Sequence, residues 1–215
     1  MNILRVNTRN RKITREPLAH EWRFLGGRAL IAKIMNEEVN PKCEPLGKQN
    51  KLIIATGPMA GTLAPHFGRI SIGGLSPLTK GIKESNAGGP IAQELDKLNF
   101  RAIILEDSPK DNNSYILKIS QSECQFINAS EIESLNVYEA ADKLFTQYGK
   151  EIKIILIGPG GERKYRSASI SLTDMEGDPS RLGGRGGLGA VLGSKGIKAI
   201  IIDSSGAPRV DLENK

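Results

Sequence analysis

Residues 52–58 read LIIATGP and residues 154–159 read IILIGP, and these two stretches decide the fold. Each is a short apolar run cut by Gly-Pro, which is typical of a buried strand that ends in a turn. The same landmarks then follow each stretch in the same order: a short strand from Ile70 or Ile170, a glycine pair at 88–89 or 186–187, and a basic residue that opens a strand, Arg101 or Lys198.

This recurrence predicts an internal duplication, with repeat halves at 51–107 and 153–204. Any α/β protein repeats strands, turns and helices, but that alternative does not explain why Gly-Pro and Gly-Gly recur at matched offsets. Two similar halves usually pack about a pseudo-twofold axis, so their glycine segments would face one another. Such an arrangement suits a ligand that is itself twofold, with two similar organic groups about a centre.

The flanking sequence completes the expected fold. It predicts a hairpin over residues 3–14, a helix after Arg28 that ends before Pro41, a hairpin over 114–127, and an amphipathic helix from Val137 to Tyr148. The expected class is α+β, with two stacked mixed β-sheets, outer helices and internal pseudo-twofold symmetry. Residues 1–209 are expected to form a single domain, and 210–215 a tail or the start of a linker.

Composition and charge narrow the function classes. The chain of 215 residues has 30 basic and 24 acidic side chains, and this excess of positive charge favours an anionic partner. Ten aromatic residues (five Phe, four Tyr, one Trp) leave few stacking platforms, which argues against single-stranded nucleic acid. No apolar run approaches the ~20 residues of a membrane span, so no membrane partner is expected and the expected location is the cytoplasm. Two cysteines are too few for a four-thiolate metal site.

The densest chemical signal is residues 181–189, RLGGRGGLG. Glycines let backbone N–H groups approach an anion, and Arg181 and Arg185 can each hold a phosphate through two hydrogen bonds. The alternative is a tight loop that needs positive φ angles and has solvent-facing arginines. The order Gly-x-Gly-x-x-Gly is present from Gly184, but no strong strand leads into it, so it is not a dinucleotide fingerprint.

The matching segment of the first half is Asn86-Ala87-Gly88-Gly89. Asn86 offers a donor and an acceptor to a ligand, although a plain helix cap is an equal alternative. Arg69 stands at the mouth of a strand and faces either solvent or ligand; the repeat favours ligand. No Ser/His/Asp or Cys/His arrangement is present, so no catalytic residue is predicted.

Three acidic residues precede the second glycine segment: Asp174, Glu176 and Asp178. They could orient Arg181 or hold a hard cation, but an ordinary acidic turn is the favoured interpretation.

These motifs resemble the N-terminal domain of the aldehyde ferredoxin oxidoreductase family, tungsten enzymes with two pyranopterin groups. One similar block runs from Gly57 to Thr79 and is followed by Asn86-Ala87-Gly88-Gly89. A second block runs from Arg181 to Lys195 and ends with Lys198-Ala199-Ile200. The resemblance covers nearly the whole chain. It departs from the family pattern at Ala87, where a serine is usual, at Leu182-Gly183, where two small residues are usual, and at Arg101, where an aspartate is common.

The resemblance implies a bis-pyranopterin tungsten cofactor (tungstopterin), with molybdenum as the alternative metal. In the family the pterin dithiolenes hold the metal and the protein supplies no ligand to it. The expected cofactor-binding residues are Arg69, Asn86, Ala87, Gly88, Arg181, Leu182, Gly184 and Arg185. A magnesium ion bridging the pterin phosphates would be held by the backbone carbonyls of Asn86 and Leu182.

The implied function is that of the cofactor-cradling domain or subunit of an aldehyde:ferredoxin-type oxidoreductase. The chain alone would not be catalytically complete, because the 4Fe-4S cluster that passes electrons to ferredoxin belongs to a further domain or a partner subunit. In this chain alone, the surface that such a partner would cover is exposed. We therefore expect an apolar or cofactor-shaped patch beside the glycine segments, and self-association as a homodimer through it. The alternatives are a non-catalytic homologue, acting as a partner subunit, carrier or assembly factor, and a basic phosphate- or RNA-binding domain, which the few aromatics disfavour.

Overall fold

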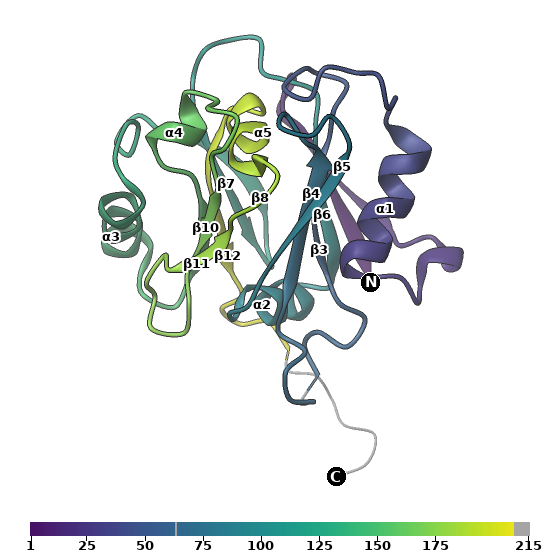
Figure 1. The fold of residues 1–215 in the computed structure, drawn as a ribbon. Coiled ribbons are helices and arrows are strands. Elements are labelled where there is room, and N and C mark those ends of the chain that lie inside the picture. Colours follow the sequence, from purple (N-terminus) through teal and green to yellow (C-terminus); the bar gives the residue numbers. More distant parts are fainter. Residues whose placement is uncertain (63, 209–215) are drawn as a thin grey trace.

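The structure is a computed structural model that describes residues 1–62 and 64–208. Two six-stranded mixed sheets stack face to face (Figure 1). The strands of the first sheet are β1 (Asn2–Asn7), β2 (Lys12–Pro17), β3 (Leu52–Thr56), β4 (Ile70–Leu75), β5 (Ile82–Ala87) and β6 (Phe100–Glu106). Those of the second are β7 (Tyr115–Ser120), β8 (Cys124–Asn128), β9 (Lys153–Leu156), β10 (Ile170–Leu172), β11 (Arg181–Gly183) and β12 (Ile197–Asp203).

Five α-helices and one short 3₁₀ helix in the described residues connect these strands. They are η1 (His20–Trp22), α1 (Gly27–Glu38), α2 (Ile91–Lys97), α3 (Val137–Tyr148), α4 (Pro159–Glu162) and α5 (Leu188–Ser194). The residue before α3, Asn136, caps the helix: its side chain accepts from the backbone N–H groups of Tyr138 and Glu139, and the Asn136 N–H donates to the Glu139 carboxylate in return.

The two sheets repeat one another strand for strand, which confirms the expected duplication and α+β class. The first sheet has the order β2-β1-β6-β3-β4-β5. The second, read from the corresponding edge, has the order β8-β7-β12-β9-β10-β11. In each sheet one central pair is parallel, β1 with β6 and β7 with β12. Both parallel pairs carry a register shift, and it falls beside Arg101 in one sheet and Lys198 in the other. The matched elements run from β1 to β12, wider than the predicted halves 51–107 and 153–204.

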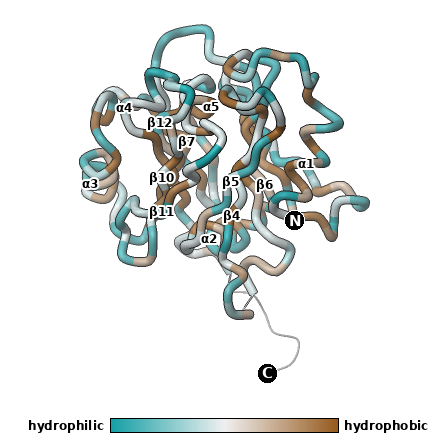
Figure 2. Tube along the Cα trace, viewed as in Figure 1, coloured by the Kyte–Doolittle hydropathy of each residue, from teal (hydrophilic) through white to brown (hydrophobic). Residues whose placement is uncertain are grey.

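Three buried clusters hold the layers together. The central cluster combines the inner faces of both sheets with apolar residues of α2 and α5, which lie between the sheets, while α1 and α3 cover the outer faces (Figure 1). Strand β3 shows why both faces are apolar: Leu52 and Ile54 point inward while Ile53 and Ala55 pack under α1. The most hydrophobic segments accordingly lie in the middle of the molecule, and the hydrophilic ones are mostly loops (Figure 2).

Most elements were predictable, and two strands were not. The two hairpins, the helix ending before Pro41, the strand at 52–56 and the helix at 137–148 are confirmed. The glycine segments at 86–89 and 181–189 contain strand residues that the sequence did not indicate: Asn86 and Ala87 end β5, and Arg181–Gly183 form β11. Both strands are edges with polar or very short sequences, so they lack the alternation that signals a strand.

No helix in the described ranges is long and apolar enough to cross a membrane. The predicted tail or linker at 210–215 lies outside the described residues.

Candidate functional site

The two edge strands β5 and β11 bring the predicted site residues together. They belong to different sheets, yet the backbone N–H of Arg185 donates to Ser85 Oγ at 3.4 Å, and Ser76 Oγ donates to the Gly186 carbonyl at 2.7 Å. At the other end of the contact, a Cβ placed on Gly89 would lie 3.8 Å from Arg181 Cγ. The glycine segments of the two halves therefore touch along one joined edge.

Asn86 and Leu182 occupy equivalent positions in the duplicated sheets. Asn86 pairs with Ser71 of β4, and Leu182 pairs with Ser171 of β10. These are the two residues whose carbonyls were expected to hold magnesium. Because the two residues are equivalent in register, their carbonyls have matching positions on the two strands.

Arg69 and Asn86 form the polar end of the first half of the site. Arg69 Nε donates to Asn86 Oδ1, and Arg69 Nη2 donates to the Asn86 carbonyl at 3.3 Å. The Arg69 side chain is exposed, and Nη1 has no hydrogen-bond partner within the described part of the chain. The helix-cap alternative for Asn86 is wrong, because α2 begins after Pro90 and has no side-chain cap.

The glycines of the second segment divide into two kinds. Gly187 has φ +66°, and a Cβ there would lie 1.8 Å from the Arg166 carbonyl oxygen, so this position serves the fold. At Gly184 the nearest atom to an added Cβ is Leu182 Cβ at 3.9 Å, and at Gly88 it is Arg69 Nη1 at 3.5 Å. Gly88 and Gly184 are thus the open glycines of the two glycine segments.

The second half of the site is more exposed and has an apolar residue where the first half has Asn86. Arg181, Gly184 and Arg185 are exposed, and Leu182 is 54% exposed although it is apolar. Other exposed large apolar side chains, Met175 and Phe67, lie in the segments that lead into β11 and β4.

The acidic residues before β11 build their own loop. Asp174 accepts hydrogen bonds from the backbone N–H groups of Glu176 and Asp178 and from Ser180 Oγ at 2.5 Å. The Ser180 hydrogen bond in particular, helped by the nearby charge of Arg181, lowers the pKa of the Asp174 carboxyl. Asp174 is therefore ionised, and both of its carboxylate oxygens accept hydrogen bonds within the loop that leads into β11. Among the described residues no group of three or more His, Cys, Asp or Glu is placed to hold a metal ion.

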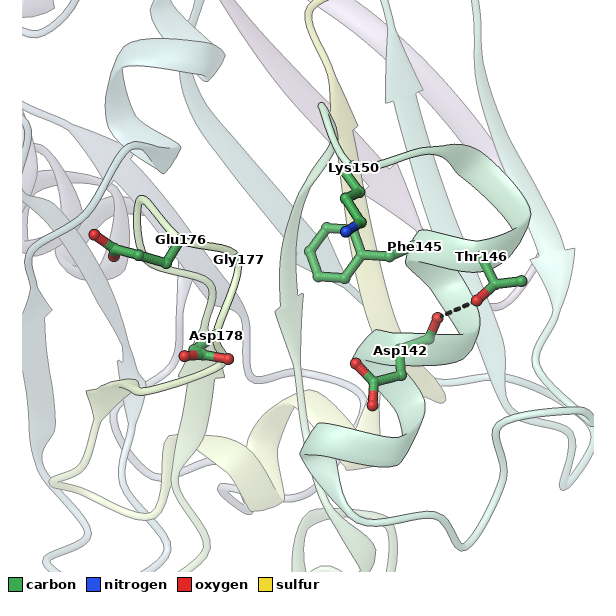
Figure 3. A pocket seen from close by; sticks show the side chains of 7 residues that line it. All are labelled: Asp142, Phe145, Thr146, Lys150, Glu176, Gly177 and Asp178. Atoms are coloured by element: carbon green, nitrogen blue, oxygen red, sulfur yellow. Dashed lines mark hydrogen bonds between the residues drawn. The ribbon is translucent and has the colours of Figure 1, made fainter.

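Two surface hollows lie near the joined edge, and one of them includes the predicted site residue Arg185. One of about 340 Å³ lies between α3 and the 174–178 loop and is lined by Asp142, Phe145 and Glu176 among others (Figure 3). It contains none of the predicted site residues, and its carboxylates would repel phosphates. The other, of about 400 Å³, is lined in part by Arg28, Lys83 and Arg185. Neither hollow is lined by Arg69, Gly88, Arg181 or Gly184.

Ser71 and Glu84 were not predicted as site residues, yet they contact the site directly. Asn86 Nδ2 donates to Ser71 Oγ at 3.1 Å, and Ser71 Oγ donates to Glu84 Oε1 at 2.7 Å. A signal for Ser71 was present in the sequence, because the strand Ile70-Ser71-Ile72 recurs as Ile170-Ser171-Leu172. Glu84 lies in a strand that the sequence did not reveal.

The fold and the joined edge define a class: a duplicated α+β domain whose two halves present open glycines and arginines side by side. A family model described as "Aldehyde ferredoxin oxidoreductase, N-terminal domain" matches residues 3–204. The chain belongs to the aldehyde ferredoxin oxidoreductase family.

Relatives agree with that assignment. The tungsten-containing aldehyde ferredoxin oxidoreductase of Pyrococcus abyssi is 37% identical over 99% of this chain and 34% of its own length. The aliphatic sulfonate oxidoreductase, WOR-like subunit, of Pyrococcus furiosus is 32% identical over 86% of this chain and 31% of its own length. Among solved structures, the active-site complex BamBC of benzoyl coenzyme A reductase with 1,5-dienoyl-CoA superposes with a TM-score of 0.86. That match has 29% identity and covers 94% of this chain and 30% of the other. The chain spans about a third of the length of the curated relatives it matches.

Proposed function

We propose that this chain is the cofactor-cradling part of a tungsten oxidoreductase, and that it binds a bis-pyranopterin cofactor along the joined edge of β5 and β11. The observation that carries the proposal is the pairing of equivalent positions. Gly88 and Gly184 are open glycines at equivalent positions, two residues after Asn86 and Leu182. Each half also offers an exposed arginine, Arg69 or Arg181, from a different position of the repeat. A ligand with two similar phosphate-bearing groups would therefore meet an open glycine and an arginine on each side.

The residues on the edge fit such a group chemically. Backbone at an open glycine lets a planar heterocycle approach closely, and arginines bind phosphate through parallel hydrogen bonds. The carbonyls of Asn86 and Leu182 would hold a magnesium ion between the phosphates, and Ala87 and Arg185 would flank the two groups. When bound, the cofactor supplies two-electron oxidation of an aldehyde to a carboxylic acid at its metal. This chain's residues bind and orient the group.

The remaining parts of the proposal lie outside this chain. The relatives are tungsten-containing by name, and their greater length leaves room for the 4Fe-4S cluster and the route to ferredoxin in other domains or a partner subunit. Tungsten is the proposed metal, and the proposed compartment is the cytoplasm.

Metal and pterin analysis of the protein purified from its native host tests the proposal. We expect tungsten and pterin near one bis-pterin centre per chain. Arg181→Ala should weaken retention by about 1.5–3 kcal/mol, the contribution of a charged hydrogen-bonding group. The exposed Arg163→Ala is the matched control and should retain the parent amount. Folded protein with neither pterin nor metal would refute the assignment and favour a non-catalytic homologue.

A further inference from the structure

We propose that Ser71 and Glu84 form a polar relay that fixes the amide of Asn86 and thereby aims Arg69 at the cofactor. Both are positioning residues, and the inference rests on the proposed function of the joined edge. The relay is a continuous chain of side-chain hydrogen bonds from Glu84 through Ser71 and Asn86 to Arg69.

The relay is built into the sheet. Ser71 is opposite Asn86 in the β4–β5 ladder, and Glu84 lies two residues before Asn86, so all three side chains share one face of the sheet. Ser71 is 4% exposed and the Glu84 side chain 11% exposed. The first turn of α1 closes over Ser71, because a Cβ on Gly27 would lie 3.2 Å from Ser71 Oγ. The Ser71 hydroxyl is therefore shielded from solvent, while Glu84 also lines the hollow of about 400 Å³ that contains Arg28.

Hydrogen-bonding chemistry gives the relay a single direction. An ionised carboxylate only accepts, so the one hydroxyl proton of Ser71 must point to Glu84. The Ser71 oxygen can then only accept, which requires the NH₂ group of Asn86 on that side. The Asn86 Oδ1 is thereby turned toward Arg69, where it accepts from Nε. Reversing the amide would place two donors against each other at Arg69.

The consequence for the site is a guanidinium held at two points. Arg69 donates to both the side-chain and the main-chain oxygen of Asn86, which leaves Nη1 beside Gly88. This is the open glycine of the first half, so the free edge of Arg69 points toward the proposed ligand surface. Without the relay the amide can rotate, and Arg69 loses its fixed direction.

The second half of the molecule lacks the relay and provides the control. Ser171 is buried and lies opposite Leu182, a residue with no amide, and no side-chain hydrogen bond of Ser171 is found in the described residues. Ser71→Ala and Ser171→Ala make the same change at equivalent positions. If Ser71 is present only because α1 needs a small residue there, replacing it with alanine should have no effect. If Ser71 is part of the relay, the same replacement should release Arg69.

Two readouts test the relay on the protein purified with whatever chains or domains accompany it. The first is the rate at which phenylglyoxal modifies Arg69 in cofactor-free protein, measured by mass spectrometry with the exposed Arg163 as the internal reference. We expect Ser71→Ala and Glu84→Ala to raise the Arg69 rate several-fold and to leave the Arg163 rate unchanged. Glu84→Gln, which can accept or donate, should fall between the parent and Glu84→Ala. Arg28→Gln removes only an ion pair to Glu84 from a largely exposed arginine, so it should have no effect.

The second readout is the rate of pterin loss from the loaded protein. Ser71→Ala should release pterin about 3- to 10-fold faster, the change expected when one hydrogen bond is lost, and Ser171→Ala should match the parent. Unchanged modification of Arg69 in both Ser71→Ala and Glu84→Ala would overturn the relay. Fast pterin loss from Arg69→Ala with parent behaviour in Ser71→Ala would also overturn it, while leaving the proposed function intact. A parent protein that binds no pterin would refute the proposed function, and the modification rates would still decide whether Arg69 is held by the relay.

Discussion

Gly184 and Gly187 lie three residues apart in one glycine-rich segment, yet a side chain would meet different surroundings at each. Gly187 needs a left-handed backbone and is pressed against the Arg166 carbonyl, whereas Gly184 has open space beyond its α-carbon. The sequence showed that glycine was dense here, but it could not separate the two roles. The crowding at Gly187 comes from the carbonyl of Arg166, which is far from this segment along the chain, so the sequence does not reveal the contact.

This difference gives a paired prediction. Gly184→Val should fold with an unchanged melting temperature and lose its cofactor, because the added branches fill only the space in front of the edge strand. Gly187→Ala should lower the free energy of unfolding by about 3 kcal/mol or more, since it combines backbone strain with a clash. Thermal unfolding and pterin content measure both effects. Parent levels of pterin in folded Gly184→Val would mean that the open side of this glycine does not face the ligand.

The register shifts in the two parallel strand pairs carry buried cations in corresponding places. Arg101 is 5% exposed and Nη1 donates to the Gly57 carbonyl. Lys198 is fully buried, donates to the Leu135 carbonyl at 2.9 Å and forms an ion pair with Glu162 at 3.1 Å. Burial lowers the pKa of Lys198, and the Glu162 carboxylate acts in the opposite direction. Each shift thus anchors the start of its strand to the loops beside it.

Lys198→Met is expected to destabilise the fold by about 3 kcal/mol, because it leaves the partly buried Glu162 carboxylate without its partner. Adding Glu162→Gln should restore part of the loss, since the amide oxygen can still accept from the Ser134 N–H. Denaturant unfolding of the two single variants and the double variant measures the coupling. Additive effects would show that the ion pair itself contributes nothing.

Helix α2 contains a carboxyl group whose ionisation opposes folding. Burial raises the pKa of Asp96 to about 6, and the positive charge of Arg101 offsets part of that rise. Between about pH 4 and pH 6 the folded chain holds more protons than the unfolded chain, so the contribution of Asp96 to stability is lost as the pH rises through this window.

Asp96→Asn should therefore raise the free energy of unfolding by about 1–2 kcal/mol at pH 7 and change it little at pH 4. Melting temperatures of parent and variant across this range provide the measurement, with the exposed Asp142→Asn as control. An equal gain at both pH values would place the cause elsewhere than in ionisation.

The predictability of the elements follows the strength of their hydrophobic pattern. Apolar β3 and amphipathic α3 were predicted with their observed bounds, because burial on two faces or on one stripe is visible in the sequence. Strand β5 is mostly polar and β11 has three residues, and both exist through backbone pairing with β4 and β10. That pairing depends on the duplicated sheet as a whole. Most of the expected site was assigned by motif, but the relay behind Asn86 depends on β5 and could not be predicted.

The two halves of the molecule share one core. Helix α2 of the first half contacts β9 and β12 of the second, and α5 of the second half contacts β3 and β4 of the first. Lys195, fully buried after α5, donates to the carbonyls of Gly47, Asn50 and Asp107 in the first half. Neither sheet keeps its inner face covered without the other half.

A cut between the halves should therefore leave them together. A protease site placed between Asn112 and Asn113, in the exposed segment 110–113, should give two fragments that elute as one species and unfold in a single transition. Size-exclusion chromatography and calorimetry of cut and uncut protein measure this. Two separable fragments, or two transitions in the cut protein, would show that the halves are independent units.

The shared helices also bear on descent. A half-length ancestor with the elements of residues 1–107 would have left the inner face of its sheet and one side of α2 in water, so we infer that it was stable only as a pair of identical chains. In that pair every substitution changed both sides at once. Fusion through the short connection at 108–114 ended that constraint, and each copy could then acquire mutations separately. Asn86 with its relay and Leu182 without one are the two outcomes at a single ancestral position.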